Sequence, residues 1–314
     1  MINRINKKKK IVPNNSKNHQ KSNQQLINEG EALIQKVEEV NVDAFDKQKV
    51  IHNFYSFPKY YDLAFTRDID NDIKFFQRCF NQYSNLNVKG ILEPACGPGM
   101  FLEKLPLYGY YSLGYDISEA MVNYSKERLK RVGIYPNKAN VILGDMKNVV
   151  FDSKFDAAII CINSLGYLTR GEDISSHFKA MGKSLKKGGI YIVEISFMCD
   201  DLRYEKKVDD TWYVKEDGIE LEVTWAIKWY DMENKIRHVD FQMVINDNGK
   251  RILLHESHDL RLWLFEDFIT LASTGGFKLV GIYNQKYELI PEHTPINGEL
   301  GVVFLILKNI EESE

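Results

Sequence analysis

The sequence predicts an α/β fold built on a mostly parallel sheet, and three observations lead to it. Between residues 88 and 198, short apolar runs alternate five times with segments of helical spacing. That order is typical of a parallel sheet with right-handed crossovers. A glycine loop joins the first apolar run to the first helix. After residue 199 the apolar spacing changes to a period of two, which indicates an antiparallel insertion.

Composition sets the outer bounds. The chain has 314 residues, 44% of them hydrophobic, and a formal net charge of -3. It can bury a sizeable core, and no general basic surface for nucleic acid is indicated. The four cysteines show no zinc spacing, so we expect reduced thiols and no metal site. No signal peptide or spanning segment is visible, so we expect a cytoplasmic protein without a membrane partner.

The chain divides into five predicted parts. Residues 1–24 are rich in Lys, Asn and Gln without an acid, which predicts a disordered basic tail or a loose contact with a polyanion or a membrane. Helical spacing begins at Gln25, and that helix is expected to pack on the main domain, to cap the ligand site or to mediate dimerisation. The remaining divisions are a helical segment and cap at 25–87, a ligand-binding core at 88–198, an antiparallel insertion at 199–263 and the end of the core sheet at 264–314.

The glycine loop indicates which ligand the core binds. A strand ends at Glu93 and runs through Cys96, Gly97 and Gly99 into a helix, which is a common nucleotide-binding arrangement. A dinucleotide fingerprint needs a third glycine where Leu102 stands, and a P-loop needs a Gly-Lys-Ser/Thr that is absent. The loop also offers no basic residue for a phosphate. It therefore suits a nucleoside without phosphates.

The spacing Glu93-x-x-Cys96-Gly97-x-Gly99 resembles motif I of the class I S-adenosylmethionine (SAM) dependent methyltransferases. The resemblance covers roughly residues 60–308. It implies a Rossmann-like sheet of seven strands, mostly parallel with an antiparallel C-terminal strand, SAM as the cofactor and S-adenosylhomocysteine as its product.

Acidic residues at strand ends support a nucleoside site. Asp116 closes the second strand about twenty residues after the glycines, where an acid binds ribose hydroxyls, although it could merely cap the next helix. The resemblance implies that Asp145 accepts a hydrogen bond from the adenine and that Met146 covers the ring. The expected cofactor-binding residues are Tyr60, Glu93, Ala95, Gly97, Gly99, Asp116, Ile117, Met121, Asp145, Met146 and Asn163.

An aromatic segment precedes the loop. Tyr60-Tyr61-Asp62 resembles a Tyr-Asp pair that lies over SAM in many small-molecule methyltransferases, and a ring face attracts a sulfonium cation. Ordinary core packing would explain these aromatics equally well. Pro58 is expected to break any helix at this point.

The insertion is expected to carry the acceptor pocket, as the resemblance implies. Alternation at 219–230, 239–243 and 252–263 predicts three antiparallel strands, with a hairpin at 246–249. Trp212, Trp225 and Trp229 could wall an aromatic pocket or simply pack one face of a sheet.

Methyl transfer from SAM needs little from side chains, because alignment and exclusion of water supply most of the acceleration. A base is needed only where the acceptor must lose a proton. The candidates are Tyr167, His255 and His258, and alternation puts the two histidines on opposite faces of one strand. Hydrogen-bonded polar strand residues are the alternative reading. Arg261 could pin a carboxylate-bearing acceptor or hold the fold.

Three functions remain open. The first, which we favour, is methyl transfer to N or O of a small-molecule acceptor. Ser164-Leu165 stands where base-modifying enzymes carry two prolines, which argues against nucleobase methylation and makes a nucleic-acid partner less attractive. The second is transfer to protein or RNA with the basic tail as a docking arm. The third is SAM binding without catalysis, in a regulatory role. The sequence leaves the acceptor, the methylated atom and a homodimer undecided.

Overall fold

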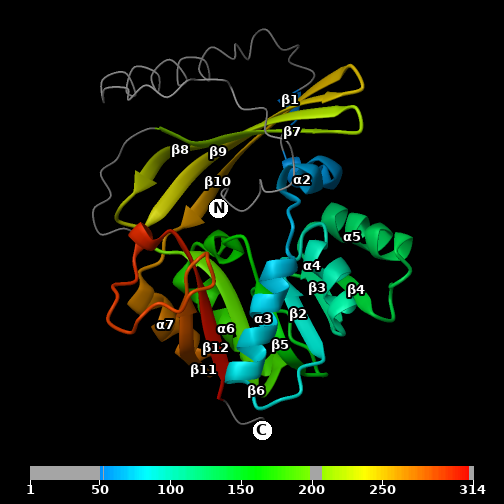
Figure 1. Cartoon of the computed structure of the whole chain (residues 1–314). Coiled ribbons are helices and arrows are strands. Elements are labelled where there is room, and N and C mark those ends of the chain that lie inside the picture. The colour runs from blue at the N-terminus through cyan, green and yellow to red at the C-terminus, as the bar shows by residue number, and fades with distance from the viewer. Residues whose placement is uncertain (1–49, 52, 199–206, 311–314) are drawn as a thin grey trace.

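The structure, a computed structural model, describes residues 50–51, 53–198 and 207–310. The predicted basic tail, the helix expected from Gln25 and the first residues of the insertion lie outside these ranges. Figure 1 shows two sheets, with the antiparallel one above the parallel one.

The parallel sheet has seven strands in the order β11-β12-β6-β5-β2-β3-β4. Only β12 runs against its neighbours, pairing antiparallel with both β6 and β11. This confirms the predicted fold class. The strands are β2 (Gly90–Pro94), β3 (Tyr111–Asp116), β4 (Ala139–Leu143), β5 (Phe155–Ile160), β6 (Leu185–Ser196), β11 (Phe277–Tyr283) and β12 (Val302–Asn309).

Helices cover both faces of this sheet, which is why its central strands are apolar along their whole length. Phe178 and Phe268 pack with Ala158 and Ile160 of β5 in one core. Phe76 packs with Ile159 in the core on the other face. The helices are α3 (Asp70–Tyr83), α4 (Met100–Lys104), α5 (Glu119–Arg131), α6 (Gly171–Ser184) and α7 (Phe265–Thr274), with short 3₁₀ turns η5 (Leu105–Tyr108), η6 (Ser164–Tyr167) and η7 (Gly298–Leu300).

The second sheet has five strands in the order β1-β10-β9-β8-β7, where three were predicted. The predicted hairpin is confirmed, with Asn248 and Gly249 both at positive φ. Two of the five strands were not predicted. In one of them acidic residues interrupt the alternation of apolar residues, and the other has two residues, which are too few to show a period. The strands are β1 (Val50–Ile51), β7 (Lys207–Glu216), β8 (Ile219–Asp231), β9 (Ile236–Asp247) and β10 (Lys250–Arg261).

The prediction that Pro58 breaks the helix was wrong. Pro58 is the first residue of α2 (Pro58–Phe65), where its missing N–H costs nothing. This helix follows the 3₁₀ turn η4 (Phe54–Ser56) and packs on the inner face of the antiparallel sheet, where Trp212 Nε1 donates to the Ala64 carbonyl at 3.1 Å. Figure 1 shows α2 between the two sheets, so it helps to close the space below the upper one.

Candidate active site

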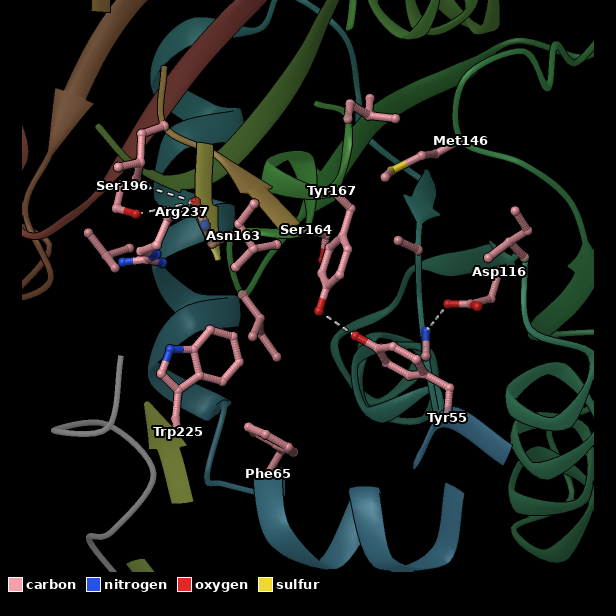
Figure 2. A pocket seen from close by; sticks show the side chains of 18 of the residues that line it. Tyr55, Phe65, Asp116, Met146, Asn163, Ser164, Tyr167, Ser196, Trp225 and Arg237 are labelled. Atoms are coloured by element: carbon pink, nitrogen blue, oxygen red, sulfur yellow. Dashed lines mark hydrogen bonds between the residues drawn. The ribbon is translucent and has the colours of Figure 1, made fainter. Parts of the chain in front are cut away.

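A cavity of about 870 Å³ lies where the carboxyl ends of the parallel strands meet the antiparallel sheet. We call the part lined by residues 95–146 the strand-end half and the part lined by α2 and strands β7–β10 the aromatic half (Figure 2). Open α/β sheets bind their ligands at this edge. Eight of the expected cofactor-binding residues line the cavity: Ala95, Gly97, Asp116, Ile117, Met121, Asp145, Met146 and Asn163.

The glycine loop takes its shape from two different constraints. Gly97 and Gly99 have φ values of +53° and +79°, a region that side chains other than hydrogen disfavour. A Cβ on Gly99 would lie 2.2 Å from Ser125 Oγ of α5, whereas nothing lies within 4 Å of one on Gly97. Gly99 is therefore required by packing and does not line the cavity, while Gly97 leaves open space on the cavity side.

Asp116 ties the glycine loop to the second strand of the core. Its Oδ2 accepts from the Gly97 N–H and its Oδ1 from the Ser118 N–H, both at 2.9 Å. Ser118 itself caps α5 by accepting from the Met121 N–H. Burial raises the pKa of Asp116, and the backbone hydrogen bonds oppose that rise. Each carboxylate oxygen keeps a second lone pair, which can accept from a ribose hydroxyl.

Glu93 lies under the loop. Its side chain is 5% exposed, and its Oε2 has no hydrogen-bond partner among the described residues. It lines a smaller adjoining cavity of about 50 Å³ and not the main one. Burial, assisted by the negative Asp116, raises the pKa of Glu93 well above its usual range.

Met146 is positioned by a histidine that sequence analysis missed. Burial lowers the pKa of His177 to about 4, so the ring is neutral near pH 7. Its Nδ1 lies 2.7 Å from the Met146 carbonyl oxygen and its Nε2 lies 2.8 Å from the Tyr191 hydroxyl. The neutral ring can donate to the first and accept from the second. The preceding Asp145 accepts from the Lys147 N–H at 2.9 Å, which holds this turn in place.

The end of β5 carries the most unusual backbone of the site. Ile162 and Asn163 follow the strand with φ values of 60° and 55°, and the strand itself ends at Ile160. A β-branched residue is strained in this region. The Ile162 N–H donates to Glu194 Oε2 at 3.0 Å, and Asn163 Oδ1 accepts from the Ser196 N–H at 3.0 Å. These bonds tie the ends of β5 and β6 together.

Tyrosines separate the two halves, but they are not all the expected ones. Tyr60 lies outside the cavity, where its hydroxyl donates to Asp247 at 2.9 Å, and its neighbour Tyr61 lines the cavity instead. The hydroxyls of Tyr55 and Tyr167 lie 2.5 Å apart between the halves (Figure 2). Burial raises the pKa of Tyr167 to about 12 and that of Tyr55 well above its usual range. Tyr167 was expected at the site, and Tyr55 was missed.

Neither expected catalytic histidine lines the cavity. The predicted alternation is present, and it places His255 on the outer face beside Asp240. His258 faces inward and is 8% exposed, but its ring lies behind Tyr55 and Tyr167, with centroids 5.7 and 5.6 Å away. Burial lowers the pKa of His258. Of the three catalytic candidates, the cavity contains Tyr167 alone.

Two of the three expected tryptophans wall the aromatic half. Trp212 and Trp225 line it, together with Phe65 of α2. Trp229 does not, because an irregularity between Ile227 and Trp229 shifts the register of β8. Its side chain is 43% exposed and stacks on His238 with centroids 4.9 Å apart.

The arginine at this site is not the expected one. Arg261 donates through Nη1 to the Thr169 carbonyl at 3.2 Å and stacks on Trp263, which is a structural role. Arg237 of β9 lines the cavity instead. Its position two residues before Val239 in an alternating strand was the signal that could have found it.

Within the described ranges, no group of His, Cys, Asp or Glu could hold a metal ion. In the same ranges, none of the helices has the length and apolar character needed to cross a bilayer. The cytoplasmic location and the homodimer stay predictions.

Comparisons with known proteins agree with this geometry. Residues 91–189 match the family model of a methyltransferase domain. The Bacillus subtilis protein YqeM, which is named a methyltransferase, is 25% identical over 198 residues, covering 62% of this chain and 76% of its own. A Streptomyces venezuelae protein named dTDP-3-amino-3,4,6-trideoxy-alpha-D-glucopyranose N,N-dimethyltransferase is 28% identical over 104 residues, or 33% of this chain and 41% of its own.

The fold has solved counterparts as well. A SAM-dependent methyltransferase from Clostridium acetobutylicum superposes with a TM-score of 0.64 at 19% identity, covering 81% of this chain and 98% of that one. The match at such low identity concerns the fold.

Proposed function

We propose that this chain is a class I, SAM-dependent methyltransferase that transfers a methyl group to nitrogen or oxygen of a small molecule, on the strength of its methyltransferase domain and fold. One observation carries the proposal. A single cavity runs from the carboxylate of Asp116 to the ring of Trp225, with Tyr55 and Tyr167 between them. A nucleoside cofactor and a second small molecule can therefore occupy the same cavity.

The strand-end half fits SAM. Asp116 would hold the ribose hydroxyls through its free lone pairs, and the open space beside Gly97 would admit the cofactor close to the backbone. Asp145 and Met146 would hold the adenine. SAM supplies an activated methyl group, and the chain contributes alignment and the exclusion of water.

The aromatic half suits an acceptor that needs little help in losing a proton. The lining residues of the described cavity include no histidine, and the tyrosine hydroxyls stay neutral near pH 7 because burial raises the pKa of each. A nitrogen that already has a free lone pair needs no base. The name of the Streptomyces venezuelae relative, an N,N-dimethyltransferase of an amino sugar, supports an amine acceptor.

The test is methyl transfer by purified protein supplied with SAM and a panel of small amines and alcohols. We expect S-adenosylhomocysteine and a methylated product, both detected by mass spectrometry, with at least one member of the panel. Asp116→Ala serves as the control for cofactor dependence. Cofactor binding without transfer to any small molecule, alongside methylation of an added protein or RNA, would move the proposal to the second function.

A further inference from the structure

The aromatic half of the cavity is lined by an arginine, Arg237, whose buried Nε has no hydrogen-bond partner among the described residues. We propose that Arg237 binds an anionic group of the acceptor, a carboxylate or a phosphate. This inference rests on the proposed function for one step, the assignment of the aromatic half to the acceptor.

The strand places Arg237 inside the cavity. Alternate residues of β9 face the core, and Arg237 shares the inner face with Val239 and Phe241, both of which are fully buried. Figure 2 shows Arg237 and Asp116 at opposite ends of the cavity, with the Tyr55–Tyr167 pair between them. The guanidinium therefore lies away from the residues that suit SAM.

The acids of the neighbouring strand positions are engaged on the outer face. Asp240 pairs with Lys228 at 3.1 Å and accepts from the Ser257 hydroxyl at 2.6 Å. Asp259 lies 2.6 Å from His238 Nδ1. Within the described residues, the buried Nε of Arg237 has no hydrogen-bond partner. Leaving a buried donor of a charged group unsatisfied is costly, so a ligand that accepts from it gains that free energy.

The surroundings strengthen such a contact. Leu260, Leu262 and Ile227 line the same part of the cavity, and apolar walls lower the local dielectric. A guanidinium presents parallel N–H donors that match two oxygens of a carboxylate or phosphate. The strand-end half thus has carboxylates where the sulfonium cofactor would lie, whereas the aromatic half has the cation Arg237 together with one carboxylate, Asp210 of β7. The acceptor is expected to carry its anionic group at the end remote from the methylated atom.

Binding of simple probes tests this without knowledge of the acceptor. The probes are benzoate, phenyl phosphate and the neutral benzamide, titrated by calorimetry into protein saturated with S-adenosylhomocysteine so that the strand-end half is filled. We expect at least one of the two anions to bind wild-type protein tenfold or more tightly than benzamide. The stronger anion identifies the group as carboxylate or phosphate.

Variants assign the contact to the side chain. Arg237→Gln should lower affinity for the preferred anion at least tenfold while leaving S-adenosylhomocysteine affinity unchanged. The anion affinity of Arg237→Lys should lie between those of wild type and Arg237→Gln. Arg131→Gln removes an exposed arginine of α5 and should change nothing. If Arg237→Gln does not fold, Arg237→Lys alone is still informative, because lysine keeps the positive charge but lacks the parallel N–H donors. Weaker anion binding by Arg237→Lys indicates a contact through two hydrogen bonds, and unchanged binding indicates an effect of charge alone.

Three outcomes would overturn the proposal: no binding of either anion to wild-type protein, benzamide binding as tightly as the anions, or equal anion affinity in wild-type and Arg237 variants. A methyl-transfer experiment distinguishes failure of this proposal from failure of the proposed function. Wild-type protein and SAM are incubated with 4-(aminomethyl)benzoate and with its neutral amide. Anion binding through Arg237 with no methylation of any amine or alcohol would keep the subsite and reject the methyltransferase activity on small molecules.

Discussion

The two halves of the cavity are held together by different kinds of contact. In the strand-end half, backbone N–H groups of Gly97 and Lys147 donate to the carboxylates of Asp116, the last residue of β3, and Asp145, just after β4. In the aromatic half, rings from distant segments pack on one another, as Phe65 does on Trp212 at 5.5 Å. Backbone contacts fix one geometry, whereas ring contacts tolerate changes of side chain. The first arrangement suits an invariant cofactor and the second an acceptor that differs between enzymes.

The largest effect that would test this comparison is expected at Gly99. Gly99→Ala places a methyl group against Ser125 and forces a positive φ on a residue with a Cβ, which should lower the free energy of unfolding by about 2–4 kcal/mol. Chemical denaturation measures the loss. Gly133→Ala is the matched control, because Gly133 also has a positive φ, of +71°, but has no atom within 4 Å of the added methyl. It should lose about 1 kcal/mol, and an equal loss in both variants would show that close packing is not what requires Gly99.

The buried neutral His177 that holds Met146 should make the free energy of unfolding depend on pH. His177 has a folded pKa of about 4, below its ordinary 6.5, so the unfolded chain binds the proton first on acidification. Stability from this residue is therefore present above pH 6.5 and is lost as the pH falls towards 4, by about 3 kcal/mol in total. Urea unfolding of wild type and His177→Gln at several pH values measures it. Parallel pH curves for the two proteins would contradict the role.

Asp116 tests the strand-end half directly. Asp116→Ala should weaken binding of S-adenosylhomocysteine by about 1–3 kcal/mol, because two ribose hydroxyls and two backbone N–H groups lose their acceptor. Calorimetry gives the affinity. Asp116→Asn, which keeps one acceptor oxygen, should lie between wild type and alanine. Unchanged affinity in both variants would remove the ribose assignment.

The smallest effect is expected in the aromatic half. Trp225→Ala should raise the KM of an accepted substrate about tenfold through lost ring contact, while S-adenosylhomocysteine affinity stays at the wild-type value. Steady-state kinetics at saturating SAM measures it. Trp229→Ala, on an exposed ring outside the cavity, should leave KM unchanged. Weaker cofactor binding in Trp225→Ala would erase the distinction between the halves.

The same distinction explains how much the sequence could predict. Asp116 follows a buried strand at a fixed distance from the glycines, so its place needed only local information, and the parallel strands were found because they are continuous apolar runs. Tyr55 and His177 were missed because their roles depend on which segments meet in space, whereas Arg237 was missed although its alternation with Val239 indicated the inner face of the strand. Tyr60 was preferred to Tyr61 because consecutive residues of an unexpected helix point in different directions. The sequence could not predict that His255 and His258 lie outside the cavity for a related reason. Alternation indicates which face of the sheet a side chain lies on, but not which other side chains lie between it and the cavity.

The two-residue strand β1 has a consequence for synthesis of the chain. It pairs with Leu253 and Leu254 of β10, and the next residues follow it into place, with the Phe54 N–H donating to Glu256 across 202 positions of sequence. A nascent chain that has not yet reached β10 has no partner for this stretch. Contacts of such long range form late because loop closure must come first. Strands β11 and β12 of the parallel sheet also follow β10 in the sequence, so both sheets acquire their last strands only in the final stage of translation. The cavity between the sheets should therefore be able to bind two small molecules only once nearly the whole chain has been made.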